Sequence, residues 1–587
     1  MPRHCIFYRL AVLLSIIVAC KGAATLADTL TSQSTVLPAN LTCRSLPSDN
    51  DWPSPETWRE LNQTVGGRLI TGVPLGAPCY LPKYDQAACA KLQNEWTAVT
   101  PFLEDPVNIV ASLWQNSSCN PLFGPNGTCE LGNLASYAIN ISSSEDAVAA
   151  VKFASQNNIR LTIKNTGHDY LGRSTGQGSL ALWTHNLKDV SFINYTDGGY
   201  SGPAVRVGAG VQGSELLAKA AAVGYRVIVG ECATVGVAGG YTQGGGHSAL
   251  GARYGLAADQ VLQWEVVTAD GQTLTVSPTT EHADLFWALG GGGPGNFAVV
   301  LSMTVKAYPD GPVAGGSFSF NNTDHATFWA AVSTWLKYTL ILDSIPGFNS
   351  AWSITAQNFQ LVYATLPDAS AADMADALGP VIAEIEALNS TVVTKTILVH
   401  PNYMQSYDAF LPQGYTTNNT LGGRLIPRSL VQTNVSALVA VMQAIAAGPT
   451  PWQINCVASN VTHLRIGNSP ASNAVLSAWR DSLFTVNFGV GWPETAKWDT
   501  LQLQERLLNE WQAMLREITP GGGTYMNEAT FDNPTWKEDY FGRNYDALLL
   551  VKKKYDPASL FWANAAVGSD RSWIMASDGR LCRPQEY

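Results

Sequence analysis

The sequence predicts two domains, an α/β first half followed by a region in which longer helices are interleaved with strands. Three observations lead to this prediction. The chain has 587 residues, which is more than one hydrophobic core usually serves. Short apolar strand patterns alternate with helical patterns up to about residue 310. From residue 311 to about 525 the helical stretches lengthen, and this change of pattern indicates a second domain.

The first elements are expected in an irregular segment and in the α/β region that follows it. Residues 28–129 are rich in Pro, Asn, Ser and Cys and have little periodicity, so we expect an irregular segment held by disulfides. Ser142 and Glu145 form a capping box that predicts the start of a helix. Further patterns predict strands at 159–163, 204–207 and 226–229, and a helix at 214–223.

The second half contains patterns of both kinds. Residues 371–388 and 501–518 are predicted to be helices, and residues 483–490 are predicted to be a strand. A last helix is predicted at 545–555, and the aromatic-rich tail behind it is expected to return to the first domain.

The N-terminus and the charge indicate a secreted protein. Residues 1–27 have the layout of a signal peptide, with an apolar run from Leu10 to Cys20 that is too short to span a bilayer. A bacterial lipoprotein site at Cys20 is the alternative interpretation. Eleven Asn-x-Ser/Thr sequons favour a eukaryotic secretory protein, extracellular or in the cell wall; they begin at Asn40, Asn62, Asn116, Asn126, Asn140, Asn194, Asn321, Asn389, Asn418, Asn434 and Asn460. The net charge of −11 argues against nucleic acid as a partner, and no later apolar stretch is expected to anchor the mature chain in a membrane.

The cysteines suggest local disulfides and one exception. Removing Cys5 and Cys20 with the leader leaves eight of the ten cysteines, and five of these lie within residues 43–129. In an oxidising compartment this crowding indicates disulfides, with Cys79/Cys89 and Cys119/Cys129 as the nearest pairs, although spacing does not fix the connectivity. No CxxC pair indicates a zinc site, and no metal is expected. Cys232 stands apart in a glycine-rich stretch.

A literal GxGxxG motif spans residues 208–213, between a predicted strand and a predicted helix, with Glu231 eighteen residues after its last glycine. This spacing is compatible with a dinucleotide-binding site. The alternative interpretation is a tight strand-to-helix turn, which we favour because such a site normally opens its domain and other glycine clusters compete with it.

Three other glycine-containing loops carry a stronger signal. They are residues 164–170, residues 230–247 and residues 290–297. Glycines let a backbone approach a ligand closely and turn its N–H groups toward phosphate. Three such loops within about 130 residues, each beside a predicted strand, indicate backbone wrapped around an extended cofactor.

These loops resemble those of the berberine-bridge-enzyme-like oxidases of the vanillyl-alcohol-oxidase superfamily, in particular the secreted fungal members. The resemblance covers roughly residues 130–310 and 480–570. In that family a histidine in a loop similar to 164–170 bonds to the flavin 8α-methyl carbon, and a cysteine in a loop similar to 230–236 bonds to flavin C6. The resemblance therefore implies FAD bound covalently through His168 and also through Cys232.

The resemblance also implies the fold, a two-domain α+β architecture of the PCMH type. Residues 130–310 and a returning segment, 526–587, would form the FAD-binding domain. Residues 311–525 would form a substrate domain with an antiparallel sheet backed by helices. The flavin-binding residues it implies are Lys164, Asn165, Thr166, Gly167, His168, Asp169, Cys232, Val235, Gly236, Gly239, Gly240, Asn296 and Asn564.

The chain departs from the family pattern at several positions. Ala233 replaces a proline, Tyr241 a frequent histidine, His247 a common aromatic residue and Ala298 a glycine. None of these changes removes a linking atom. Related enzymes with valine at the position of Val235 tend to admit oxygen, so an oxidase with dioxygen as acceptor is expected.

The position expected for the base that takes the substrate proton holds a different residue from the one usual in the family. Residues 525–528 resemble a Tyr-x-Asn-Tyr segment whose last tyrosine serves as or beside the base, and here that position is Glu528. Residues 483–488 resemble a strand whose catalytic glutamate or glutamine is here Asn487, which cannot accept a proton at neutral pH. We expect Glu528 as the base and Asn487 to orient the substrate, with Tyr241 or His247 assisting.

Simpler interpretations stay open for each of these residues. His168 would then be an ordinary loop histidine, Cys232 a buried free thiol, Glu528 a surface carboxylate and His247 a structural residue. Cysteine parity bears on this choice, because a flavin bond at Cys232 leaves seven others and obliges one more to stay free.

The expected function is oxidation of a C–H bond in a small alcohol, amine or secondary-metabolite intermediate by hydride transfer to flavin N5. A carbohydrate oxidase on the same scaffold is the nearest alternative, since 18 tryptophans could supply sugar-binding platforms. A secreted flavin-binding protein with little turnover is the alternative from another class. The sequence does not fix the substrate or the oligomeric state.

Overall fold

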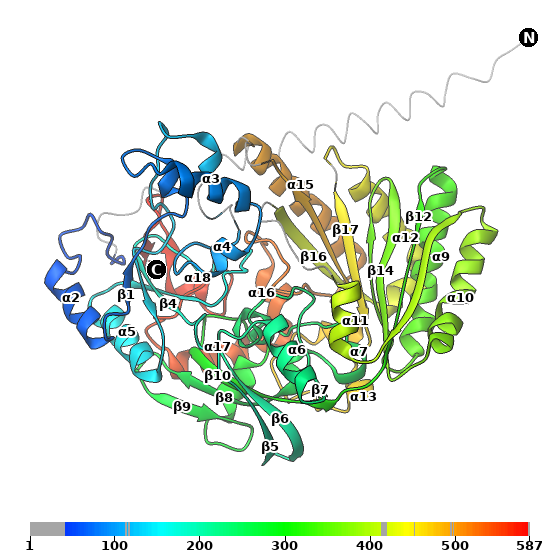
Figure 1. The fold of residues 1–587 in the computed structure, drawn as a ribbon, viewed down its shortest axis with the longest axis horizontal. Helices are drawn as coiled ribbons and strands as arrows, with labels where there is room; N and C mark the ends of the chain where they lie inside the picture. Colours follow the sequence, from blue (N-terminus) through cyan, green and yellow to red (C-terminus); the bar gives the residue numbers. More distant parts are fainter. Residues whose placement is uncertain are drawn as a thin grey trace, which may run out of the picture.

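The computed structural model describes residues 42–584 apart from 112–113, 115–117, 412–418, 451, 494–495 and 497. The expected signal peptide and the sequons at Asn40, Asn116 and Asn418 lie outside the described residues. Two domains lie side by side (Figure 1), one drawn mainly in blue to green with the red C-terminal segment, the other in lime to orange. The expected two-domain α+β fold is thereby confirmed.

The N-terminal segment contains more regular structure than its composition predicts. Short helices follow one another through it, and β1 joins a sheet of the first domain. The helix α2 forms because Ser54 caps it, accepting a hydrogen bond from the backbone of Thr57, and Pro55 begins it. The elements are α2 (Pro55–Thr64), β1 (Leu69–Thr71), η1 (Ala77–Cys79), α3 (Gln86–Glu95), α4 (Thr100–Leu103) and η3 (Pro121–Phe123).

The first domain is built on two sheets. A four-stranded sheet has the order β1-β2-β4-β3, with β2, β3 and β4 parallel, and a five-stranded antiparallel sheet has the order β5-β6-β10-β8-β9. The bounds of the strands are β2 (Tyr137–Asn140), β3 (Arg160–Lys164), β4 (Ser179–Trp183), β5 (Val190–Asp197), β6 (Tyr200–Gly208), β8 (Val261–Val267), β9 (Thr273–Val276) and β10 (Val299–Lys306), with the small pair β7 (Tyr225–Arg226) and β11 (Tyr308–Pro309) beside them. The connecting helices are α5 (Ser144–Gln156), α6 (Gly213–Ala222), η4 (Val237–Tyr241), α7 (Gly251–Tyr254), η5 (Ala257–Gln260) and α8 (Ala283–Leu289).

Two local predictions need correction. The helix α5 has Ser143 as its N-cap, and Ser142 instead donates its backbone N–H and its hydroxyl to Asp146, which also pairs with Arg68. The strand predicted at 226–229 is shorter than expected, because only Tyr225 and Arg226 pair with β11 while the following apolar residues pack in the core without a partner strand.

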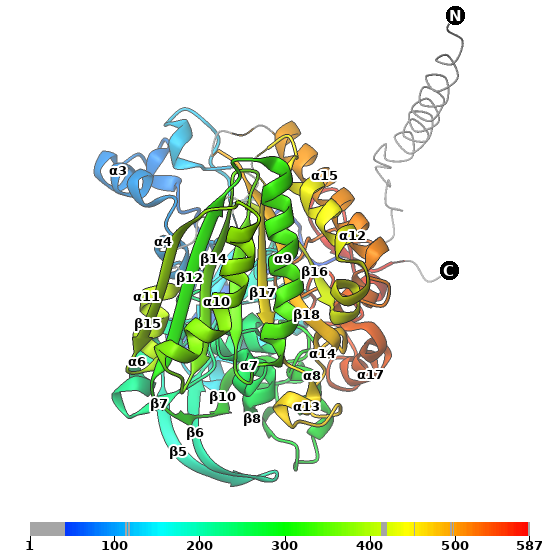
Figure 2. The same ribbon diagram turned by 90° about the vertical axis from the view of Figure 1, so that its right-hand side faces the viewer.

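The second domain is a seven-stranded antiparallel sheet with the order β15-β12-β14-β13-β17-β18-β16. Figure 2 shows the long helices α9, α10, α12 and α15 lying over its outer face. The strands are β12 (Val313–Asn321), β13 (Asn349–Ile354), β14 (Asn358–Pro367), β15 (Val392–His400), β16 (Asn419–Pro427), β17 (Gln453–Ser459) and β18 (Ser482–Gly491). The helices are α9 (His325–Ser344), α10 (Ala371–Ala387), α11 (Tyr403–Phe410), α12 (Arg428–Ala446), α13 (His463–Ile466), α14 (Ala478–Asp481) and α15 (Trp498–Ile518).

Strand alternation gives this sheet two different faces. On β13, Trp352 and Ile354 join the apolar core beneath the helices. Ala351 and Ser353 belong to the opposite face and line a cavity. The helix α12 is long and apolar enough to cross a membrane by length and composition, but Leu438, Met442 and other residues pack into this core. We therefore describe α12 as a core helix.

The C-terminal segment returns to the first domain, as its position beside the blue strands in Figure 1 illustrates. It contains α16 (Trp536–Phe541), η6 (Gly542–Asn544), α17 (Tyr545–Tyr555), α18 (Ser569–Ser572), β19 (Ile574–Met575) and β20 (Leu581–Cys582). Phe561 bridges to Leu161 on β3. A disulfide between Cys43 and Cys582 joins the two ends of the described chain.

The other disulfides agree with the sequence. Cys79 pairs with Cys89 and Cys119 pairs with Cys129, as the nearest spacings predict. Within the described residues Cys232 and Cys456 are free. By the parity argument a flavin bond at Cys232 would leave one further thiol free, and the buried Cys456 is such a thiol.

Candidate active site

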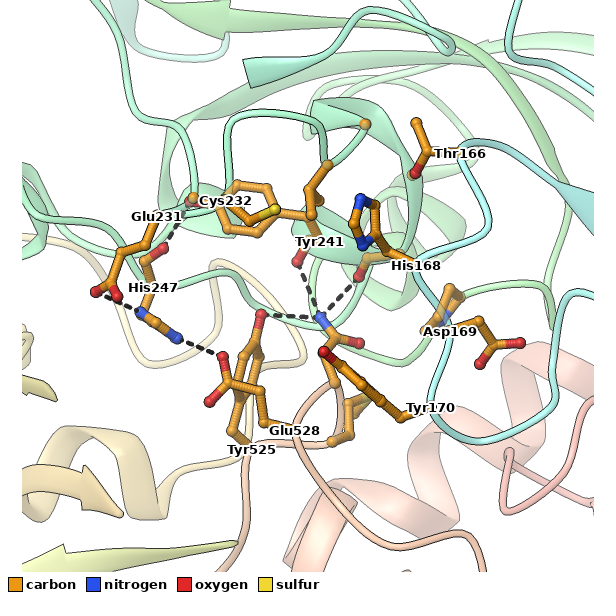
Figure 3. A pocket seen from close by; sticks show the side chains of 18 of the residues that line it. Thr166, His168, Asp169, Tyr170, Glu231, Cys232, Tyr241, His247, Tyr525 and Glu528 are labelled. Atoms are coloured by element: carbon orange, nitrogen blue, oxygen red, sulfur yellow. Dashed lines mark hydrogen bonds and ion pairs between the residues drawn. The ribbon is translucent and has the colours of Figure 1, made fainter. Parts of the chain in front are cut away.

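A cavity of about 680 Å³ lies between the two domains, within the usual size range of small-molecule and cofactor sites. Loops of the first domain, residues 165–174 and 230–243, form one side. Strands β13, β14, β16, β17 and β18 supply the inner face of the sheet, and residues 525–528 close the cavity from the C-terminal segment. Figure 3 shows labelled side chains from the first-domain loops and from residues 525–528 turned toward one space.

His168 and Cys232 are brought together at this cavity from loops that lie 64 positions apart in the sequence, and both side chains line it (Figure 3). Thr234 joins them. Its Oγ1 lies 2.9 Å from His168 Nε2 and 3.5 Å from Cys232 Sγ. The two residues that the resemblance singles out therefore share one wall.

The electrostatic surroundings keep this histidine neutral. Burial, with a further contribution from the Lys164 ammonium, lowers the pKa of His168 to about 4. Burial raises the pKa of the Cys232 thiol, and hydrogen bonds from Thr234 and the backbone of Val235 oppose that rise. At neutral pH His168 thus presents an uncharged imidazole to the cavity.

Lys164 lies behind the wall and does not line the cavity. Its side chain is fully buried, and Nζ donates to the backbone oxygens of Phe102, at 3.1 Å, and Asp105, at 2.7 Å. Burial lowers the pKa of Lys164 to about 7, although Asp105 opposes the shift. Its observed role is to fix the end of β3, from which the His168 loop departs.

The glycines of the second loop allow a close approach of backbone to Asn165. A Cβ at Gly236 would lie 2.3 Å from Asn165 Oδ1, and one at Gly239 would lie 3.0 Å from Asn165 Nδ2. Asn165 Nδ2 donates to the Ala209 backbone oxygen, whereas Oδ1 is buried without a hydrogen-bond partner among the described residues. An unpartnered buried oxygen at the cavity wall is an acceptor that a bound ligand could satisfy.

The GxGxxG turn serves packing. A Cβ at Gly208 would lie 2.4 Å from the Leu187 oxygen, and one at Gly210 would lie 1.9 Å from the His185 oxygen. Of residues 208–213 only Ala209 lines the cavity. These glycines therefore permit neighbouring backbone segments to touch, which agrees with the tight-turn interpretation.

A second cluster lies across the cavity and centres on His247. Its Nε2 lies 2.9 Å from Glu528 Oε1, and its Nδ1 lies 3.6 Å from Glu231 Oε1. Asn487 Nδ2 donates to Glu528 Oε2 at 2.8 Å, and the Tyr363 hydroxyl donates to Glu231 at 2.5 Å. Figure 3 shows His247 between the two carboxylates.

The charges of this cluster stabilise one another. Burial alone would lower the pKa of His247, but Glu528 and Glu231 raise it to about 10. Burial alone would raise the pKa of Glu528, but His247 and the hydrogen bond from Asn487 hold it below its ordinary value. The pair is therefore an imidazolium with a carboxylate at neutral pH, and Glu528 is in the ionised form that a general base must have.

Tyr241 is placed as a support. Its hydroxyl donates to the His247 backbone oxygen at 2.8 Å, which fixes the loop that carries the imidazolium. Burial raises the pKa of Tyr241 well above its ordinary value, so the hydroxyl stays protonated. Asn527 Nδ2 donates to the Gly240 backbone oxygen at 2.9 Å and so ties the Glu528 segment to the same loop.

The inner face of the sheet presents a row of polar side chains. Asn455 lies opposite Asn487 in the β17–β18 register and donates to its Oδ1 at 3.1 Å. Gln453 lines the cavity from β17 as well, Ser353 from β13 and Gln360 from β14. Sequence reasoning identified Asn487 but missed the other members of this row, although the alternation of polar and apolar residues on these strands could have revealed them.

Most of the expected site residues meet at the cavity. Those that line it are Asn165, Thr166, Gly167, His168, Asp169, Cys232, Val235, Gly236, Gly239, Gly240, Tyr241, His247, Asn487 and Glu528. Lys164, Asn296 and Asn564 do not. Asn296 donates to the Val567 backbone oxygen at 3.2 Å, and Asn564 donates to the Phe531 backbone oxygen at 2.9 Å, so both hold the C-terminal segment in place.

Three residues of the site were not predicted as members of it. Thr234 lies behind His168 and Cys232, Glu231 was considered only as a partner of the GxGxxG motif, and Tyr363 comes from a strand with no recognised motif. Glu231 and Thr234 do lie inside the loop 230–236 that the resemblance singled out, and this is the signal that could have found them.

Family models match both parts of the chain that form the first domain. One described as "FAD binding domain" matches residues 135–277, and one described as "Berberine and berberine like" matches residues 524–568. Residues 524–568 include Glu528, Asn564 and the helix α17.

Similar proteins span nearly the whole chain. The VAO-type flavoprotein oxidase VAO615 of Thermothelomyces thermophilus is 40% identical over 555 residues, covering 92% of this chain and 95% of that protein. The FAD-linked oxidoreductase patO of Aspergillus clavatus is 41% identical over 550 residues, covering 92% and 94%. The crystal structure of the VAO-type flavoprotein MtVAO615 from Myceliophthora thermophila, at 38% identity, aligns with a TM-score of 0.88 over 92% of this chain and 100% of that one. The chain therefore belongs to the berberine-bridge-enzyme-like, VAO-type family of FAD-dependent oxidoreductases.

Proposed function

We propose that the protein is a secreted oxidase that holds FAD covalently through His168 and Cys232 and oxidises a C–H bond of a small organic substrate. The observation that carries this proposal is the shared wall of the cavity, where Thr234 touches both linking side chains, with an ionised carboxylate, Glu528, at the same cavity.

The residues at the cavity fit FAD. Its volume suits an extended ligand, and the glycine positions 236 and 239 leave no room for side chains beside Asn165. The unpartnered Oδ1 of Asn165 is a free acceptor for a ligand N–H group. The neutral His168 and the Cys232 thiol have the chemistry of nucleophiles.

The protein's own residues would divide the remaining work. FAD, when bound, would supply the acceptor for the hydride, which carries the electron pair of the C–H bond. Glu528 takes the substrate proton, because it is ionised and lies at the cavity. Asn487 orients Glu528 through its 2.8 Å hydrogen bond, and His247 keeps the carboxylate charged.

The substrate class is a small alcohol, an amine or a secondary-metabolite intermediate, with dioxygen as the acceptor. Val235 lines the cavity three residues after Cys232, where the family resemblance associates valine with access of oxygen. The name "flavoprotein oxidase" of the VAO615 relative supports the same choice. The leader, the sequons and the three disulfides support secretion.

A carbohydrate oxidase is the second candidate, favoured by the row of amide side chains on the sheet. Asn455, Gln360 and Gln453 can donate to and accept from sugar hydroxyls. Solved neighbours of this fold include a carbohydrate oxidase from Microdochium nivale, at 21% identity, a level at which the likeness concerns the fold alone.

The test is oxygen consumption and hydrogen peroxide formation over a panel of alcohols, amines and oligosaccharides, with anaerobic bleaching of the flavin for each active compound. Glu528→Gln should lower the bleaching rate by roughly 10²- to 10⁴-fold while flavin stays bound. Unchanged bleaching in this variant would remove Glu528 from the base role. A flavin that no compound bleaches would point instead to a binding protein with little turnover.

A further inference from the structure

Thr234 makes an unusual pair of contacts behind the cavity wall. Its single hydroxyl lies 2.9 Å from His168 Nε2 and 3.5 Å from Cys232 Sγ. The residue does not itself line the cavity, where His168 and Cys232 do (Figure 3). One small polar group therefore touches the two side chains to which flavin attachment is assigned.

The protonation state of His168 limits how these contacts are made. Because its pKa is lowered to about 4, the ring is neutral and carries hydrogen on only one nitrogen. If the Thr234 hydroxyl donates to Nε2, the single ring hydrogen of His168 must sit on Nδ1. Nδ1 then has no lone pair for bond formation. If Nε2–H donates to Thr234, Nδ1 has a free lone pair, and the hydroxyl hydrogen can turn to Cys232.

The sulfur of Cys232 must lose its proton before it can attack the flavin. Burial raises the pKa of the thiol and so disfavours the thiolate, which is the reactive form. The Thr234 hydroxyl and the backbone N–H groups of Thr234 and Val235 oppose this rise. A hydroxyl hydrogen directed at Sγ therefore supports the form of Cys232 that can attack.

This inference rests on the proposed covalent attachment. We propose that Thr234 is a positioning residue for flavinylation, ordering a directional chain from His168 Nε2–H to Thr234 Oγ1–H to Cys232 Sγ. The chain leaves His168 Nδ1 and Cys232 Sγ as the two nucleophilic atoms. One hydroxyl thereby prepares both bonds at once.

The atoms and electrons of both bond-forming steps balance when dioxygen is the oxidant. At His168 an N–C bond forms and at Cys232 an S–C bond forms, each replacing a C–H bond of the flavin. In each step the flavin carbon loses one hydrogen, as a proton, and the protein nucleophile loses one proton. The electron pair released by each step passes to dioxygen, which leaves with two protons as hydrogen peroxide.

The test measures both bonds directly in the purified, full-length holoprotein. Peptide mass spectrometry gives the fractions of His168 and Cys232 that carry flavin, on purification and after aerobic incubation with excess FAD at several pH values. The variants are Thr234→Val, which removes the hydroxyl and keeps the shape, and Thr234→Ser, which keeps the hydroxyl. Thr339→Val is the matched control, because the buried Thr339 on α9 loses a hydroxyl that donates to the Leu336 backbone oxygen, at 2.6 Å, and does not line the cavity.

In Thr234→Val the Cys232 bond should form roughly ten- to a hundredfold more slowly, the loss expected for a hydrogen bond to a charged group, and should need a higher pH. The His168 bond should also form more slowly, while Thr234→Ser and Thr339→Val match the wild type. Wild-type rates in Thr234→Val, failure of Thr234→Ser to restore them, or an equal loss in Thr339→Val would each overturn the proposal. A wild type that carries neither bond would instead refute the proposed function.

Discussion

His247 shows how a single residue sets the charge of the candidate active site. Its imidazole lies between Glu528, at 2.9 Å, and Glu231, at 3.6 Å, and the three side chains are held by Asn487 and Tyr363. A buried carboxylate beside an imidazolium stays ionised at pH values where an isolated buried carboxylate would bind a proton. The acidic limit of activity should therefore depend on His247.

Replacing His247 with glutamine keeps a donor near Glu528 but removes the positive charge. The pKa of Glu528 should rise, because burial is then opposed mainly by Asn487. We expect the acidic limb of the pH profile of flavin reduction to move upward by about one to three pH units. His282→Gln, which alters a histidine bonded to Tyr555 on α17, is the control. An acidic limb that stays in place would separate His247 from the ionisation of Glu528.

At this scale the sequence predicted the side chains that carry chemistry and missed those that support them. His168, Cys232, Asn487 and Glu528 lie in motifs that resemble a known family, and all four line the cavity. Tyr363 reaches Glu231 from a strand 132 positions away along the chain. A contact of this kind depends on the packing of two domains, which no local pattern contains.

At the scale of elements, Glu505 connects the helix α15 to its neighbours. The hydroxyl of Thr420, on β16, donates to it at 2.7 Å, and the hydroxyl of Thr530 donates to its other oxygen. Burial, and after it the nearby Asp532, raise the pKa of Glu505 above the ordinary 4.5. In the folded protein this carboxyl group therefore binds a proton more readily than in the unfolded chain.

The sign of the pH effect follows from this shift. A carboxyl group whose pKa is higher in the folded state than in the unfolded state adds to the free energy of unfolding. This contribution is fully present below the pKa of the unfolded state and is lost as the pH rises through the pKa of the folded state. The apparent unfolding temperature of the wild type should fall by about 1 to 3 °C more than that of Glu505→Gln between about pH 5.5 and about pH 8. Differential scanning calorimetry measures the unfolding temperatures of both proteins. The control is Glu517→Gln, which alters an exposed residue on the same helix. Parallel falls in wild type and Glu505→Gln would contradict the assignment.

Element bounds could be predicted where one periodic pattern is long. The helix α17 coincides with the prediction at 545–555, and β18 extends the predicted strand by one residue at each end. The strand order of the seven-stranded sheet could not be predicted, because β16 and β17 both pair with β18 across connections of very different length. The short helices before residue 129 escaped detection because caps and prolines, rather than apolar periodicity, define them.

At the scale of the whole molecule, buried ion pairs hold the domains together around the cavity. Asp259 of the first domain accepts two hydrogen bonds from Arg480 of the second, at 2.7 and 2.9 Å, and both side chains are buried. Asn468 and Asn473 also donate to Asp259. The carboxylate thus has three side-chain partners from the other domain, and the backbone N–H of Leu256 in its own domain also donates to it, at 2.9 Å.

Removing one member of this pair should cost more than removing both. Arg480→Met leaves Asp259 as a buried charge without its partner, and we expect a loss of about 3 to 5 kcal/mol. The double variant Asp259→Asn with Arg480→Met should lose less, since no unpaired charge remains. Chemical denaturation of the two variants tests this order, and an equal or greater loss in the double variant would contradict it.

The ends of the molecule illustrate what the sequence could not reveal at this scale. The disulfide between Cys43 and Cys582 spans 539 positions, and spacing favours near neighbours, so only the fold identifies this pair. The α+β architecture itself followed from the family resemblance. Periodicity alone indicated only that short alternating strand and helix patterns give way to longer helical patterns near residue 311.

The most direct test of the account is the intact mass and visible spectrum of the acid-denatured protein, beside His168→Ala and Cys232→Ala. The account predicts that the wild type keeps its yellow colour and the added mass of one FAD. Each single variant should retain flavin through the remaining bond, and the double variant should lose it. Colour that separates from the denatured wild type would contradict covalent attachment at His168 and Cys232.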